Sequence, residues 1–254
     1  MRIFLCNNMF MKNSRATILG FRVDLLRFDE ALDFIVKKSE TKSTQTVTIN
    51  PEMISLGEKN EEFAEILKTA DLVIPDGFGI KLGLKIKGIE QERIPGIEFA
   101  KKLIEYCAKT HLPIALLGAK EEVLQGACDN LSKEFPELNI VCKRNGYFKE
   151  EDEKEIIEEL KSANPKLVLV ALGVPKQEIF IRRILSEFPN TIFVGVGGSF
   201  DVWSGKVKRA PLFFRKIGCE WLWRLIKEPS RFNRMFPTLP LFLFKVIIEK
   251  IQNK

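Results

Sequence analysis

Residues 167–201 read LVLVALGVPKQEIFIRRILSEFPNTIFVGVGGSFD, and this stretch decides the fold class. Residues 167–172 and 192–196 are short apolar runs of the kind that form buried strands. Residues 176–187, which separate them, carry apolar side chains at helical spacing. A strand, a helix and a second strand in this order indicate two parallel strands joined by a helical crossover.

The same alternation extends along the chain in both directions. Further apolar or β-branched segments predict strands at residues 16–19, 44–49, 71–75, 113–117 and 140–142. Helical spacing predicts helices at residues 28–38, 52–70, 80–86, 96–110, 121–134 and 150–162. The sequence therefore predicts an α/β protein with a Rossmann-like, mostly parallel sheet, helices on both faces, and ligands beyond the carboxyl ends of the strands.

The C-terminal residues differ in charge from the rest of the chain. The 254 residues carry a formal net charge of +6. Residues 206–254 contain 12 Lys or Arg and 3 Glu, a local charge of +9, so the first 205 residues carry −3. We therefore predict an α/β core over residues 15–210 and a basic, amphipathic helical appendage over residues 211–254. An anionic partner is expected for such an appendage.

Membrane contact is expected without membrane insertion. Residues 236–248 are apolar but interrupted by Pro237, Pro240 and Lys245, so this stretch is too short to span a bilayer and is suited to lying on its surface. An exposed apolar tail of this kind also invites self-association into a homo-oligomer. No secretory signal is expected at the N-terminus.

The cysteines and the histidine indicate a reducing compartment. The five cysteines are scattered, with no C-x-x-C pair, and His111 is the single histidine. We expect reduced thiols in a cytoplasmic protein, and no zinc site.

Polar residues follow two of the predicted strands. Thr48 and Asn50 end the strand at 44–49 and can present a hydroxyl and an amide to a ligand, although Asn50 is also a good helix N-cap. Asp76 follows the buried strand at 71–75, where a general base would lie. A plain helix cap with glycine turn chemistry is an equal alternative for Asp76.

Glycines mark two other strand exits. Gly118 lies between a strand and a helix, where main-chain N–H groups can face a phosphate. Gly195, Gly197 and Gly198 place three glycines within four residues, a density that close approach to a ligand explains better than a simple turn. Asp201, just beyond them, can accept a hydrogen bond from a ribose or a base.

The appendage supplies candidate phosphate ligands. Arg231 and Arg234 lie three residues apart on one helix face, and Arg224, one heptad earlier, would join them in a continuous helix, which Pro229 is expected to break. Convergent arginines suit a diphosphate. A solvated basic face is the alternative. No nucleic-acid-binding motif is present, so no nucleic-acid partner is expected. No two aspartates lie within two positions of each other, so a D-x-D metal clamp is absent from the sequence.

Taken together, these blocks resemble the WecG/TagA/CpsF family of bacterial glycosyltransferases over about residues 16–236. The matching blocks are Thr48-x-Asn50, Pro75-Asp76-Gly77-x-Gly79, Arg93-x-x-Gly96, Gly146-Tyr147-Phe148, Leu172-Gly173-x-Pro175-x-Gln177-Glu178, Gly195-Val196-Gly197-x-x-Phe200-Asp201, Gly205-x-x-x-Arg209-Ala210-Pro211, Glu220-Trp221-x-x-Arg224-Leu225 and Glu228-Pro229-x-Arg231-x-x-Arg234. Glu98 departs from the pattern, because family members commonly have Asp at that position.

The resemblance implies a UDP-sugar-dependent hexosyltransferase that inverts the anomeric centre and needs no metal or other cofactor. It implies N-acetylmannosamine, or a related sugar, as the group transferred, and N-acetylglucosaminyl-diphospho-undecaprenol as the acceptor, in cell-wall or surface polysaccharide synthesis. The implied location is cytoplasmic, peripheral on the inner face of the cell membrane.

The resemblance also implies a role for each matching residue. Asp76 corresponds to the catalytic base. Pocket residues are implied at Thr48, Asn50, Arg93 and Gln177. Contacts with the nucleotide are implied for Tyr147, Gly197, Gly198 and Asp201. Arg224, Arg231 and Arg234 are implied to close over the site and to meet the lipid diphosphate.

Three alternatives stay open on the sequence. Another hexose, such as a glucosyl or glucuronosyl unit, would serve exopolysaccharide assembly. A non-catalytic nucleotide-sugar sensor at the membrane would use the same fold, although Asp76 together with the arginines argues against it. A nicotinamide oxidoreductase fits the sheet but lacks the G-x-G-x-x-G fingerprint.

Overall fold

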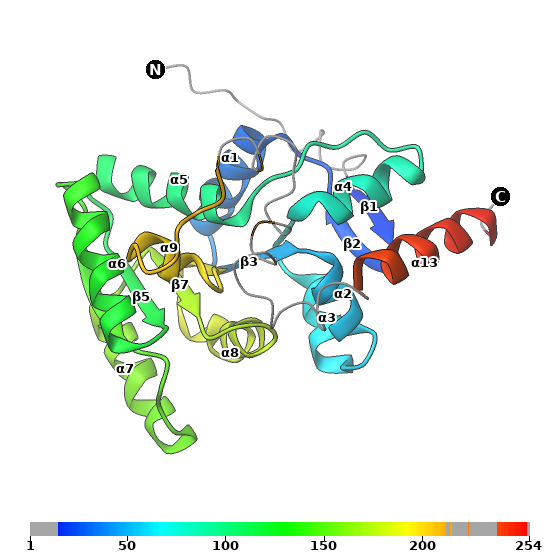
Figure 1. Cartoon of the computed structure of the whole chain (residues 1–254). Coiled ribbons are helices and arrows are strands. Elements are labelled where there is room, and N and C mark those ends of the chain that lie inside the picture. Colours follow the sequence, from blue (N-terminus) through cyan, green and yellow to red (C-terminus); the bar gives the residue numbers. More distant parts are fainter. Residues whose placement is uncertain (1–14, 212–213, 215–222, 224–237, 253–254) are drawn as a thin grey trace.

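The computed structural model describes residues 15–211, 214, 223 and 238–252 (Figure 1). Within these residues the main sheet has six strands in the order β4-β3-β8-β7-β5-β6, and every pairing is parallel. The strands are β3 (Thr44–Ile49), β4 (Leu72–Pro75), β5 (Ile114–Gly118), β6 (Ile140–Arg144), β7 (Leu167–Ala171) and β8 (Ile192–Gly195). All six carboxyl ends therefore lie along one edge of the sheet.

Helices cover both faces of this sheet, as Figure 1 shows for α1 and α5 on one side and α3 and α8 on the other. The reason is visible along β5, where successive side chains point to opposite faces. Ile114 and Leu116 join one core cluster, and Ala115 and Leu117 join another. The first cluster includes residues of α1 (Phe28–Ser39), α5 (Gly96–Lys109), α6 (Glu121–Glu134) and α9 (Ser199–Trp203); the second includes α7 (Glu153–Ala163) and α8 (Lys176–Ile184). The predicted Rossmann-like α/β class is confirmed.

The N-terminal end of the described chain is a hairpin rather than the single strand predicted at 16–19. β1 (Arg15–Ile18) and β2 (Phe21–Asp24) pair antiparallel. The turn between them places Leu19 and Gly20 at positive φ, 51° and 77°. Leucine rarely adopts this conformation, so Gly20 is the one residue of the pair whose type indicates a turn. Asp24 attaches the hairpin to β4 by accepting a hydrogen bond from the Val73 main chain at 2.8 Å.

The helix predicted over residues 52–70 is two helices, α2 (Pro51–Gly57) and α3 (Glu61–Thr69). The break has a local cause, because Asn60 is the N-cap of α3 and its Oδ1 accepts from the Phe63 main-chain N–H at 2.9 Å. Asn followed by Glu61 and Glu62 is a helix-start signal. The predicted segments at 150–162 and 176–187 are each a helix joined to a short 3-10 turn.

The last helix, α13 (Thr238–Gln252), runs without a break through Pro240 and Lys245, the two described residues that interrupt the apolar run of the sequence. Pro240 lies in the first turn, where its missing N–H removes no intrahelical hydrogen bond. Pro237 lies outside the described residues. No helix in the described part of the chain is long and apolar enough to cross a membrane.

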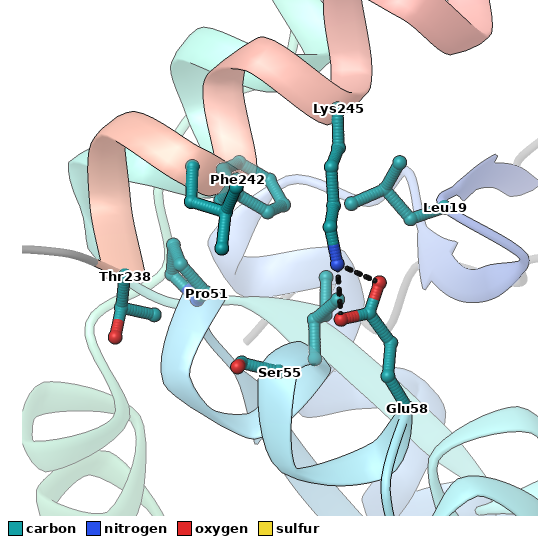
Figure 2. A pocket seen from close by; sticks show the side chains of 9 residues that line it. Leu19, Pro51, Ser55, Glu58, Thr238, Phe242 and Lys245 are labelled. Carbon is teal, nitrogen blue, oxygen red and sulfur yellow. Dashed lines mark hydrogen bonds and ion pairs between the residues drawn. The ribbon is translucent and has the colours of Figure 1, made fainter.

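One side of α13 is packed against α2 and α4 (Gly77–Ile86). Phe242 and Val246 are buried there, in a core cluster shared with the hairpin and α3. Gly83 of α4 makes room, since a Cβ at this position would lie 2.5 Å from Ile18 Cδ1 and 3.1 Å from the Phe242 ring. Figure 2 shows the small pocket that α13 and α2 form, with Lys245 Nζ paired to Glu58 at 2.6 Å across it. The predicted domain boundary at residue 211 stays a prediction.

Candidate active site

The predicted site residues within the described chain gather at the carboxyl edge of the sheet, but they do not all lie together. Thr48 and Asn50 end β3, and Asp76 follows the neighbouring strand β4. Gly197 and Gly198, the glycine loop, follow β8, which is the next strand on the other side of β3. The strand order therefore places Asp76, the β3 residues and the glycine loop in adjacent positions along one edge.

Asp76, Thr48 and Asn50 form the most compact part of this edge. The main-chain N–H of Asp76 donates to the Ile49 carbonyl at 2.9 Å, which holds the start of α4 against the end of β3. Asp76 is half-buried and occupies the N-cap position of α4, yet its carboxylate accepts no capping hydrogen bond from that helix. Asp76 therefore occupies the position that the cap alternative predicts, but its side chain makes no capping hydrogen bond.

Asn50 has a structural task. It is the N-cap of α2, and its Oδ1 accepts from the Met53 main-chain N–H at 3.0 Å. Because Oδ1 is engaged, the Nδ2 amide group is the part of this side chain suited to donate to a ligand. The capping and ligand-binding interpretations of Asn50 are therefore compatible.

The segment before α5 brings Arg93 and Gly96 to the same place. Ile94, next to Arg93, donates its main-chain N–H to the Pro75 carbonyl at 2.9 Å. A Cβ on Gly96 would lie 2.9 Å from Thr48 Cγ2 and 3.2 Å from its Oγ1, so glycine is needed for α5 to start against Thr48. Arg93 is half-buried beside the strand end that carries Asp76.

The buried side chain of Gln177 forms a hydrogen bond with the glycine loop after β8. Gln177 is 3% exposed, and its Oε1 accepts from the Gly197 main-chain N–H at 3.0 Å. Its Nε2 donates to Glu178 Oε1 at 2.7 Å. The structure thus places Gln177 beneath the loop, where it orders the Gly197 main chain. Gly198 is exposed, and a Cβ there would lie 3.8 Å from Asp201 Oδ2, so Asp201 lies beside the loop.

Glu178 is part of the family block around Gln177, but the sequence analysis assigned it no role. Its side chain is 2% exposed, and burial raises the pKa of its carboxyl to about 8, although hydrogen bonds from Gln177 and from the main chain oppose the shift. The group is therefore largely protonated at neutral pH. Its sequence signal was an acidic residue on the inward side of a helix, three residues before the buried Ile181.

Tyr147 lies far from Asp76. It follows β6, at the opposite margin of the sheet from β4, and is 72% exposed. The residue before it, Gly146, donates its main-chain N–H to the Ala119 carbonyl at 2.8 Å, and a Cβ on Gly146 would lie 3.0 Å from Leu172 Cδ2, so the chain turns back here across the ends of β5 and β7. The structure therefore brings the segment before Tyr147 to the end of β7, the strand next to β8 and its glycine loop, and not to the end of β4 that carries Asp76.

The turn at Gly118 has a structural explanation. A Cβ on Gly118 would lie 2.4 Å from the Ala171 carbonyl oxygen, and the Ala119 N–H donates to that oxygen at 3.0 Å. Close packing of β5 on β7 requires the glycine, and the Ala119 N–H is already used. The suggestion that this turn faces a phosphate is not supported at Ala119.

The remaining predictions concern the end of the core. Arg224, Arg231 and Arg234 lie outside the described residues. Arg209, in the Arg-Ala-Pro block, pairs through Nη2 with Glu98 Oε1 at 2.6 Å. Glu98 lies in the first turn of α5, so its longer side chain reaches the start of the C-terminal segment. Among the described residues, no group of three or more His, Cys, Asp or Glu side chains could hold a metal ion.

An open parallel sheet with polar residues and a glycine loop at its carboxyl edge defines a Rossmann-like α/β protein with a ligand site at that edge. The chain belongs to the WecG/TagA/CpsF family of glycosyl transferases, whose model matches residues 16–254. It is 35% identical over 208 residues to an N-acetylglucosaminyldiphosphoundecaprenol N-acetyl-beta-D-mannosaminyltransferase of Bacillus subtilis (strain 168), covering 82% of this chain and 80% of the relative. A protein of the same name from Bacillus spizizenii (strain ATCC 23059 / NRRL B-14472 / W23) is 34% identical over 209 residues, with the same coverage.

Proposed function

We propose that this chain transfers N-acetylmannosamine, or a related hexose, from a UDP-sugar to N-acetylglucosaminyl-diphospho-undecaprenol, in cell-wall or surface polysaccharide synthesis. The observation that carries the proposal is the convergence of Asp76, Thr48 and Asn50 at one strand edge, in a chain whose relatives bear the name of this activity. We propose further that the transfer inverts the anomeric centre and uses no metal.

The proposed reaction is a single displacement. The Asp76 carboxylate takes the proton of the acceptor hydroxyl while that oxygen bonds to the anomeric carbon of the donor. The bond from the anomeric carbon to the UDP oxygen breaks on the opposite face, and UDP leaves with the bonding electrons. Arginine side chains and main-chain N–H groups offset the charge that grows on the leaving diphosphate. In this account Thr48, Asn50 and Arg93 line the sugar pocket, while Gly198, Asp201 and Tyr147 serve the nucleotide.

The appendage is proposed to bring Arg224, Arg231 and Arg234 to the lipid diphosphate. Both neighbours of their segment are attached at the edge that carries Asp76. On one side, Arg209 pairs with Glu98 in the first turn of α5. On the other, Leu239 meets Gly79, three residues after Asp76, where a Cβ would lie 2.8 Å from its Cδ1. These attachments support a position of the basic segment close to the proposed base.

The membrane surface is proposed to contact the outer side of α13, opposite the face that packs on the core. This side carries large apolar side chains at spacings of three or four residues, all exposed to solvent: Leu241, Phe244, Ile247, Ile248 and Ile251. Such a stripe suits a helix that lies in the headgroup region. It would hold the enzyme on the inner face of the membrane, where the lipid-linked acceptor is found.

The test of the proposed base is Asp76→Ala. We expect this variant to lose sugar transfer while its affinity for UDP stays within about twofold of wild type, because the base touches the acceptor and not the nucleotide. Asp129→Ala is the matched control, since Asp129 is an exposed carboxylate on α6. Transfer that survives in Asp76→Ala would remove Asp76 from the mechanism. Loss of UDP binding would make it a donor ligand instead.

A further inference from the structure

A chain of two hydrogen bonds runs from a buried carboxyl to the glycine loop. Glu178 Oε1 accepts from Gln177 Nε2 at 2.7 Å, and Gln177 Oε1 accepts from the Gly197 N–H at 3.0 Å. Gln177 and Glu178 lie in the first turn of α8, and their side chains lie beneath the loop that follows β8, the third strand in the order of the sheet. Within the loop, Gly198 is exposed to solvent.

The arrangement requires close packing on all sides. A Cβ on Gly195 would lie 2.5 Å from Gln177 Nε2 and 2.8 Å from Glu178 Oε1, so the strand must end in glycine for the pair to fit. The Glu178 carbonyl accepts from Gln45 Nε2 at 2.9 Å, and Gln45 Oε1 accepts from Arg182 Nε at 3.0 Å. The first turn of α8 is therefore fixed to β3 as well as to the loop.

Stability alone is a poor reason for a carboxyl at position 178. Its Oε2 is buried and makes no hydrogen bond within the described part of the chain. Burying a carboxyl that is only half satisfied costs free energy, and an apolar side chain of similar length would avoid that cost. What the carboxyl does supply is one acceptor, directed at Gln177.

That acceptor decides which way the Gln177 amide faces. A glutamine amide has an oxygen at one end and an NH₂ group at the other, and the two ends have nearly the same shape. With Glu178 Oε1 accepting from Nε2, the amide oxygen must face Gly197. In the reverse orientation Nε2 would face the Gly197 N–H, two donors would meet, and the loop would lose its hydrogen bond.

We propose that Glu178 is a positioning residue for the donor nucleotide: by fixing the orientation of the Gln177 amide, it holds the glycine loop in the conformation that binds UDP. This inference rests on the proposed function, because it takes the loop to be the nucleotide site. Glu178 itself does not touch the nucleotide.

The experiment measures the affinity for UDP by isothermal titration calorimetry in four proteins: wild type, Glu178→Met, Glu178→Gln and Ile181→Ala. Methionine keeps the length of the side chain without the acceptor, whereas glutamine restores an acceptor oxygen. Ile181 is fully buried on the same helix and takes part in none of these hydrogen bonds, so Ile181→Ala lowers stability and keeps all of their donors and acceptors. Thermal unfolding of each protein reports the stability loss.

We expect Glu178→Met to weaken UDP binding about tenfold, which corresponds to about 1.4 kcal/mol. Glu178→Gln should return to within about twofold of wild type, and Ile181→Ala should bind UDP like wild type in spite of its lower melting temperature. The inference is overturned if Glu178→Met binds UDP as wild type does, or if Ile181→Ala weakens binding as much. It also falls if the wild type does not bind UDP. The proposed function fails separately, when wild type binds UDP but transfers no sugar.

Discussion

Replacing Phe242 with alanine should destabilise the protein by about 3 kcal/mol, whereas the same change at Phe244, two residues along α13, should cost less than about 0.5 kcal/mol. Phe242 is 3% exposed and packs where Gly83 leaves room for its ring. Phe244 is 61% exposed on the outer side of the helix. The two variants remove the same atoms from the same helix. A difference between them therefore distinguishes the effect of packing α13 on the core from the effect of its outer surface.

The size of the Phe242 effect follows from what the ring buries. Full burial of a phenylalanine side chain contributes about 1.5–3 kcal/mol of transfer free energy, and the cavity left by alanine adds to the loss. For a chain of this length, 1 kcal/mol shifts the melting temperature by about 2–4 °C, so 3 kcal/mol corresponds to about 6–12 °C. Phe244→Ala should leave the melting temperature within about 2 °C of wild type.

Two assays are needed, thermal unfolding followed by circular dichroism and flotation with vesicles that contain anionic lipid. Phe244→Ala should float more weakly than wild type without losing stability. Equal melting temperatures for the two variants would refute the docking of α13 on α2 and α4. Unchanged flotation of Phe244→Ala would refute the membrane face, and a change in oligomeric state on size-exclusion chromatography would assign that face to self-association instead.

Three further predictions concern the site. Glu178→Gln should gain stability relative to wild type as the pH rises from 5 to 8. The folded-state pKa of Glu178, about 8, exceeds the ordinary 4.5, so only wild type loses the contribution of this carboxyl across that window, by less than about 5 kcal/mol. A difference in unfolding free energy between the two proteins that stays constant with pH in denaturant unfolding would contradict this. A double-mutant cycle on Glu98 and Arg209 should give a coupling energy of about 0.5–1 kcal/mol, because the pair is partly exposed. A coupling energy near zero would show that this ion pair does not attach the start of the C-terminal segment to α5. Gly195→Ala should destabilise the protein by about 1–3 kcal/mol through overpacking on Gln177 and Glu178 and should also weaken UDP binding; a variant as stable as wild type would show that the pair can move aside.

Much of the fold could be predicted because the sheet is buried on both faces. The strands β5, β7 and β8 are continuous apolar runs bounded by glycine, and such runs are readable in a single sequence. The hairpin of β1 and β2 was missed because Gly20 is the one common turn residue in its turn, and its partner Leu19 rarely adopts positive φ. The path of α13 through Pro240 depends on where the helix begins, and a sequence pattern does not fix that position.

The candidate site was predictable to the extent that it follows strand ends. Asp76 and Thr48 come directly after predicted strands, and a parallel sheet brings such residues to one edge. The hydrogen bonds that join Glu178, Gln177 and the glycine loop were not predictable, because they depend on how α8 packs beneath the loop after β8. Gly118 looked like a ligand turn but serves the approach of β5 to β7, a contact between residues far apart in the sequence.

The measurement that tests the account most directly is UDP release by the purified protein. A panel of UDP-sugars would be offered with a short-chain N-acetylglucosaminyl-diphosphate lipid, with and without EDTA. The account predicts UDP release with UDP-N-acetylmannosamine or one related donor, dependent on the acceptor and unchanged by EDTA. UDP binding without release from any donor would contradict the proposed transfer and would favour a nucleotide-sugar sensor.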